Sequence, residues 1–180
     1  MIDQAHSTFL LTQARAGSIR HSGRTLYAHL SGTHDLLEAW GNPKPVCDAG
    51  LFHSIYGTNK FRKSAWPTSD RATIKQLIGP DAELLVYLFF LSDRPKVFFP
   101  EREPENGSPT LRRLREIEAA NLLEQRSKSR WLQRLLDSNI SDGAKRAIAQ
   151  RLTAEEATAV PMATARTSGD APPASTARRD

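Results

Sequence analysis

Two histidines lie inside segments that otherwise have the apolar pattern of buried helices. His29 falls within residues 23–40, and His53 within residues 45–56, where it directly follows the apolar run Ala49-Gly50-Leu51-Phe52. Burying an imidazole in a helix costs free energy unless its nitrogens are hydrogen-bonded or bound to a metal. The short stop Gly41-Asn42-Pro43 separates the two segments, so they can pack antiparallel and bring both rings into one core. Metal sites of helical proteins are commonly built in such cores.

The rest of the first 152 residues also has helical patterning. Residues 57–67 predict a loop, and the Pro- and Glu-rich residues 95–109 predict irregular structure. Further helices are expected at 5–14, 71–78, 80–92, 110–124, 128–136 and 143–152. The sequence therefore predicts an all-α fold, a compact helical bundle over residues 3–152.

Residues 153–180 have a different composition, dominated by Ala, Thr, Ser and Pro. Such a segment buries too little apolar surface to offset its chain entropy, so we expect a disordered tail. The single cysteine, Cys47, excludes an internal disulfide and a cysteine-only zinc site. The longest apolar run, residues 84–91, is far shorter than the roughly 20 residues of a membrane-spanning helix. We expect a cytoplasmic protein with no membrane association.

The positive charge of the chain is concentrated in its C-terminal helices. Residues 111–152 contain ten basic and five acidic residues, whereas residues 1–110 contain twelve basic and eleven acidic residues. A basic helical surface can meet a protein partner or phosphate groups, but a solvated face with intrahelical ion pairs is the more usual reason for such charge. No nucleic-acid-binding motif accompanies it, so we expect no nucleic-acid partner.

The segment around the two histidines resembles the HD-domain superfamily of metal-dependent phosphohydrolases, in particular the hydrolase domain of the ppGpp synthetase/hydrolase enzymes. In that pattern a glycine precedes the first metal-binding histidine by six residues, and an apolar run ending in His-Asp follows about 24 residues later. Here Gly23 precedes His29 by six residues, and His53 follows His29 by 24. Residues 78–86 resemble a Phe-Gly-x-x-Val-Ala-x-Leu-Val stretch of the same enzymes, and residues 91–94 resemble their Leu-Ala-Asp-Arg motif.

The resemblance implies an HD-like fold with His29, His53 and Asp93 as metal ligands. A two-histidine, one-carboxylate set suits Fe(II) and can also hold Mn(II) or Zn(II), so the expected cofactor is a divalent metal. The sequence departs from the pattern at Ser54, which stands in place of the dyad aspartate. The acidic pair used in ppGpp hydrolysis falls on Gly57 and Thr58, so that particular reaction is not expected.

Further residues are candidates for the same site. A fourth ligand can come from His21, His34 or Glu118, and spacing alone selects none of them. The other candidates for lining a site or meeting an anionic substrate are Ser54, Tyr56, Lys60, Arg62 and Asn121.

These residues support three hypotheses. The first is a metal-dependent hydrolase of a small phosphorylated or nucleotide-like substrate, and the second is an Fe(II)-dependent oxygenase with the same ligands. The third is a non-catalytic module that binds a small ligand in a degenerate site, or a protein through its basic helices 111–152.

Overall fold

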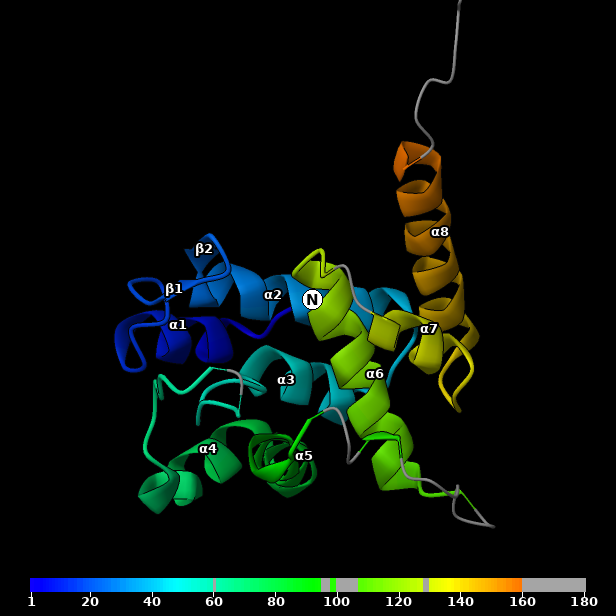
Figure 1. Cartoon of the computed structure of the whole chain (residues 1–180). Coiled ribbons are helices and arrows are strands. Elements are labelled where there is room, and N and C mark those ends of the chain that lie inside the picture. Colours follow the sequence, from blue (N-terminus) through cyan, green and yellow to red (C-terminus); the bar gives the residue numbers. More distant parts are fainter. Residues whose placement is uncertain (60, 95–97, 100–106, 128–129, 160–180) are drawn as a thin grey trace, which may run out of the picture.

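The computed structural model describes residues 1–59, 61–94, 98–99, 107–127 and 130–159 (Figure 1). Within these ranges the protein is all-α, as predicted, and its strands are confined to one two-residue hairpin. The elements, in chain order, are α1 (Gln4–Thr12), β1 (Arg20–His21), β2 (Arg24–Thr25), α2 (Leu26–Ala39), α3 (Lys44–Phe52), η1 (Thr68–Asp70), α4 (Arg71–Ile78), α5 (Pro80–Leu91), α6 (Pro109–Glu124), α7 (Arg130–Leu136) and α8 (Asp142–Ala159).

Helices α2 and α3 form the centre of the bundle, and their close packing depends on a glycine. Gly41, with a φ of 75°, follows the first helix, where the sequence predicted a stop. Pro43 is the N-cap of α3, which begins at Lys44 and ends at Phe52, whereas the sequence predicted a helix over residues 45–56. A Cβ placed on Gly50 of α3 would lie 2.2 Å from Cδ1 of Leu37 and 3.6 Å from Cγ2 of Thr33, both in α2. A side chain at this position would require Leu37 to shift from its place in the core.

The remaining helices cover this central pair on different sides. Helix α6 crosses α2 and α3 and contacts both, while α5 packs on α3 and α4 packs on α5 (Figure 1). A single apolar core joins α1 through α6, and a smaller cluster at the C-terminal end joins α6, α7 and α8 through Ala119, Leu132, Leu135, Ile140, Ala144 and Ile148. Among the described helices, none has both the length and the apolarity needed to cross a bilayer.

A small hairpin precedes α2, where the sequence predicted that the helix would begin at Gly23. Ser22 and Gly23 both have positive φ angles, 47° and 85°, which is the geometry of a two-residue hairpin turn. Arg20 pairs with Thr25 and His21 pairs with Arg24 across the turn. Helix α2 then begins at Leu26, because the Thr25 side chain accepts a hydrogen bond from a backbone N–H of its first turn.

The last helix is longer than the sequence predicted. Helix α8 continues to Ala159, whereas the tail was expected to begin at Thr153. Alanine and glutamate favour helix in this stretch, and Arg151 pairs with Glu155 one turn later. The rest of the expected tail, residues 160–180, and most of the expected irregular segment, residues 95–109, lie outside the described residues.

Helix α1 is fixed to the bundle by a buried histidine. His6 packs edge-on against the ring of Phe52, with Nε2 3.2 Å from the carbonyl oxygen of Leu77 and Nδ1 3.5 Å from Oδ1 of Asp48. The interaction with Asp48 is the main cause of the raised pKa of His6. Both ring nitrogens face oxygen acceptors, which only the protonated imidazolium can satisfy.

The tight contact at Gly50 makes a stability prediction. We expect Gly50→Ala to destabilise the fold by about 1–3 kcal/mol, because the added methyl group would force the fully buried Leu37 to repack. Urea unfolding measures this. In the double variant with Leu37→Ala, the clash is relieved, so the loss should be smaller than the sum of the two single losses. Additive losses would contradict the contact.

The buried His6 makes a pH prediction. Because its pKa is raised in the folded state, its stabilisation is present below its ordinary pKa of 6.5 and is lost as the pH rises through the folded value. The free energy of unfolding of the wild type should therefore fall, relative to that of His6→Gln, as the pH rises above 6.5 through the raised pKa of the folded protein. Parallel pH profiles for the two proteins would exclude a charged His6.

Candidate functional site

The structure brings His29 and His53 together, as their spacing predicted. Their Nε2 atoms lie 3.2 Å apart, and both residues are fully buried between α2, α3 and α6. The His53 Nδ1 lies 2.7 Å from the carbonyl oxygen of Gly50 and donates to it, and the ring of Phe89 packs edge-on against the same imidazole. The His29 Nδ1 faces Oε2 of Glu124, the last residue of α6.

The hydrogen-bond partners of the two rings place the protons on the Nδ1 atoms, so both Nε2 atoms are unprotonated. The carbonyl of Gly50 fixes the proton of His53 on Nδ1, and an ionised Glu124 does the same for His29. Burial raises the pKa of Glu124, but Arg24 pairs with its other oxygen and favours the ionised form. Two lone pairs then face each other at 3.2 Å, an arrangement that needs a proton or a metal cation between them.

Burial keeps both imidazoles neutral. It lowers the pKa of His29 to about 3, with the neighbouring His21 as the second cause. It lowers the pKa of His53 well below its usual value, again with a neighbouring histidine, His29, as the second cause. Neutral imidazole, oriented through its other nitrogen by an oxygen acceptor, is the form in which histidine binds metals.

Asp93, which the resemblance implied as the third ligand, lies elsewhere. It is exposed and accepts a hydrogen bond from Nδ2 of Asn59 at 3.3 Å. The cause is local, because α5 ends at Leu91 and Ser92 is extended, with a ψ of 126°, so the next two side chains point to opposite sides. Arg94, not Asp93, turns inward. No carboxylate of a described residue completes a compact three-ligand group with the two histidines.

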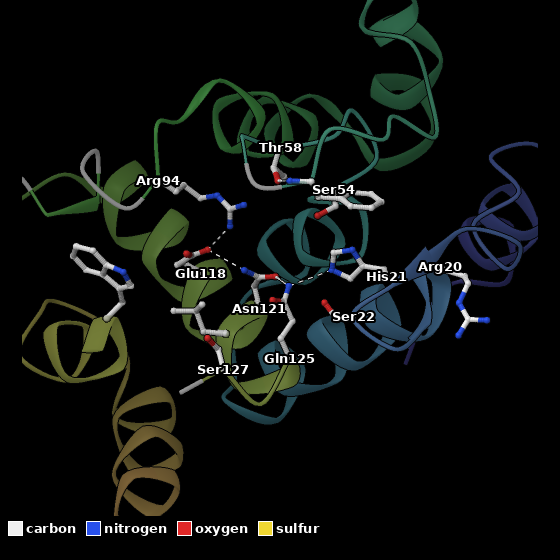
Figure 2. Close-up of a pocket in the computed structure, with 13 residues that line it drawn as sticks. Arg20, His21, Ser22, Ser54, Thr58, Arg94, Glu118, Asn121, Gln125 and Ser127 are labelled. Carbon is white, nitrogen blue, oxygen red and sulfur yellow. Dashed lines mark hydrogen bonds and ion pairs between the residues drawn. The ribbon is translucent and has the colours of Figure 1, made fainter. Parts of the chain in front are cut away.

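A pocket of about 420 Å³ opens beside the histidine pair (Figure 2). A chain of polar contacts runs along one wall. Arg94 Nη1 donates to Glu118 Oε2 at 2.6 Å, Asn121 donates to the same oxygen at 3.1 Å, and Gln125 donates to Oδ1 of Asn121 at 2.9 Å. The pocket is lined by Arg20, His21, Ser22, Ser54, Thr58, Phe61, Arg94, Glu118, Asn121, Leu122, Gln125, Ser127 and Trp131.

His21 connects the pocket to the buried histidines. Its ring centroid lies 4.4 Å from that of His29, and its Nε2 lies 3.2 Å from Nε2 of Gln125 at the end of the polar chain. The edge-on ring of Phe61 holds it from another side. Burial lowers the pKa of His21, so it is a neutral group in the pocket wall.

Four of the additional residues singled out from the sequence line this pocket: His21, Ser54, Glu118 and Asn121. Tyr56 does not line the pocket, because its hydroxyl donates to Glu83 at 3.1 Å instead. Burial raises the pKa of this hydroxyl.

The structure describes one of the two basic candidates, Arg62, and that residue does not line the pocket. Arg62 is exposed and absent from the pocket wall, and Lys60 lies outside the described residues.

Sequence reasoning missed Arg94, Gln125 and Glu124. Gln125 was detectable, because positions 118, 121 and 125 form one polar stripe of a helix that is otherwise amphipathic. Glu124 lies beside that stripe and approaches α2 at Gly32, where an added Cβ would lie 3.0 Å from its side chain.

A second group of potential metal ligands lies on α2. Ligand atoms of His34, Asp35 and Glu38 lie within 4.8 Å of one another. His34 is buried, whereas Asp35 and Glu38 are exposed. None of the three lines the pocket, and among the described residues no compact ligand group joins His34 to His29 or His53.

Comparison with known proteins gives one match. Residues 10–94 match a family described as a domain of unknown function, DUF6817. The matched region contains both buried histidines and Arg94, but it ends before α6, which supplies Glu118, Asn121 and Glu124. No curated protein and no solved structure matches the chain.

Proposed function

We propose that this chain is a degenerate HD-type domain that binds one divalent metal at His29 and His53 and hydrolyses a small phosphorylated or nucleotide-like molecule in the adjoining pocket. One observation carries the proposal. The two Nε2 atoms face each other at 3.2 Å while both Nδ1 atoms are held by oxygen acceptors, Gly50 O and Glu124. This is the arrangement in which protein metal sites orient their histidines.

The donor set fits iron, manganese or zinc. Metal–nitrogen bonds of about 2.1 Å that meet at 100–110° place two nitrogens about 3.2–3.4 Å apart, close to the observed separation. Two imidazoles suit all three metals and leave positions open for ligands from the pocket side. A bound divalent metal would supply a water of lowered pKa and positive charge next to a phosphoryl group.

The surrounding residues have complementary tasks. Phe89 packs against the imidazole of His53, and Phe61 packs against that of His21. These rings keep bulk water from the two buried histidines. Glu118 accepts hydrogen bonds from Arg94 and Asn121 through a single oxygen, so its carboxylate is fixed at the pocket wall. The pocket volume, about 420 Å³, suits a small molecule.

A second candidate function is a module that binds the same ligand without converting it. Ser54 replaces the dyad aspartate of the family pattern, and Asp93 faces solvent, so two carboxylates of an HD-type site are missing from it. An Fe(II) oxygenase would need a carboxylate facing the two histidines, and neither Asp93 nor any other described carboxylate forms such a group with them.

Metal binding is the first test. We expect the purified protein to bind one equivalent of Fe, Mn or Zn, measured by elemental analysis and by Co(II) absorbance. His29→Ala and His53→Ala should weaken binding by at least about 100-fold, and Glu124→Gln, which keeps the shape of the side chain, by about 10–100-fold.

Two variants serve as controls for the metal site. Asp93→Ala should leave the metal affinity unchanged, because that side chain faces solvent. His34→Ala should also leave it unchanged, since this residue belongs to the separate group on α2. Loss of the metal in His34→Ala but not in His53→Ala would move the site to that group and refute the proposal.

Turnover separates the enzyme from the binding module. We expect metal-dependent release of phosphate from small phosphate monoesters, abolished in His53→Ala, when the metal-loaded protein is assayed with a substrate panel. Ligand binding without phosphate release, with each of the three metals, would favour the non-catalytic module. Oxygen consumption by the iron form would instead favour the oxygenase.

A further inference from the structure

Arg94 is a buried cation that uses little of its hydrogen-bonding capacity. Its side chain is only 6% exposed, and of its five N–H donors, Nη1 alone has a hydrogen-bond partner among the described residues, Oε2 of Glu118. Its Nε is buried without any partner. One face of the guanidinium lies over the ring of Phe89, with Cζ 4.4 Å from the centroid. Buried polar groups are normally satisfied, so the spare donors indicate a missing acceptor.

The side chain of Arg94 belongs to the pocket wall. Figure 2 shows its guanidinium directed toward Glu118, across the pocket from His21. Ser54 lines the same pocket, one residue after the buried His53, and within the described chain its hydroxyl has no hydrogen-bond partner. A guanidinium with unused N–H donors and a hydroxyl with no partner among the described residues therefore border one cavity.

The charge of the pocket wall favours an anion. Arg20 and Arg94 contribute two positive charges to this wall, and Glu118 contributes one negative charge. The described lining therefore carries a net charge of +1. Glu118 does not occupy all the N–H donors of Arg94, because it accepts a hydrogen bond from one nitrogen only, Nη1. This hydrogen bond holds the guanidinium in place.

We propose that Arg94 and Ser54 receive the phosphoryl group of a phosphate monoester, an assignment that deepens the proposed function and rests on it for the substrate class. Guanidinium groups bind phosphate oxygens through several parallel N–H donors, and Arg94 has such donors to spare. The pocket is much larger than one phosphate ion, so the organic part of the ester occupies the remaining space toward Gln125 and Trp131.

This assignment differs from the one that the sequence favoured. Lys60 and Arg62 were the expected phosphate ligands, but Arg62 is exposed and does not line the pocket. In the sequence, Arg94 is only the last residue of the motif in which the resemblance marks Asp93 as the ligand.

The test is calorimetric titration of the full chain with inorganic phosphate and with adenosine monophosphate, in the presence of a chelator. We expect both to bind, the nucleotide more tightly, because it fills more of the pocket. Arg94→Ala should weaken both by at least about tenfold, and Ser54→Ala by a smaller factor. Glu118→Gln should tighten binding, since it removes a negative charge while keeping the shape of the side chain.

Arg62→Ala is the matched control, because it removes the same charge outside the pocket, and it should bind phosphate like the wild type. Circular dichroism identifies any variant that fails to fold, and Ser54→Ala and Glu118→Gln keep the test valid if Arg94→Ala does. Unchanged binding in Ser54→Ala together with no gain in Glu118→Gln would overturn the assignment, as would equal losses in Arg62→Ala and Arg94→Ala.

The result is distinguishable from failure of the metal proposal. Phosphate binding is measured without metal, and metal binding is measured without phosphate. Loss of metal in His53→Ala with unaltered phosphate binding would support two separate subsites. Metal binding that persists while neither phosphate nor the nucleotide binds the wild type would overturn the phosphate assignment alone.

Discussion

The close packing of α2 against α3 is the constraint on which the rest of the structure depends. Gly50 lets the two helices approach until the side chain of Leu37 fills the space where a Cβ would stand. The same residue supplies the carbonyl that orients His53, so one glycine sets both the helix separation and the direction of an imidazole. With the helices further apart, His29 and His53 would be two isolated buried polar groups, each costly to the fold.

Burial and hydrogen bonding act in the same direction at this centre. Removal from water lowers the pKa of both imidazoles, and the acceptors on their Nδ1 atoms direct both Nε2 atoms to one point. The pocket beside them is built differently, from charged and amide side chains that are paired along α6. The protein thus places a pair of neutral imidazoles next to a charged pocket wall, with the ring of His21 between them.

The sequence could predict those parts of the structure that follow from the periodicity of apolar residues and from the spacing between the two histidines. The helices were predictable because apolar residues recur with helical spacing. The contact between the two histidines was predictable because they lie 24 residues apart in two helices that a short turn joins, so the helices can pack antiparallel. Glu118 and Asn121 were predictable as inward polar residues of an amphipathic helix. The sequence could not show that Arg94 points inward while Asp93 faces solvent. This difference depends on the backbone torsion of Ser92, which no residue pattern specifies.

The boundary of the family match has a consequence for how this site can diversify. Residues 10–94 carry the histidine pair and Arg94, while α6 contributes Glu118 and Asn121 to the wall that Arg94 also lines. A chain that shares only the matched region would keep the two central helices and the buried rings, yet its pocket would be closed by whatever segment follows. The wall of the pocket can therefore change through one helix, without disturbing the core that holds the imidazoles.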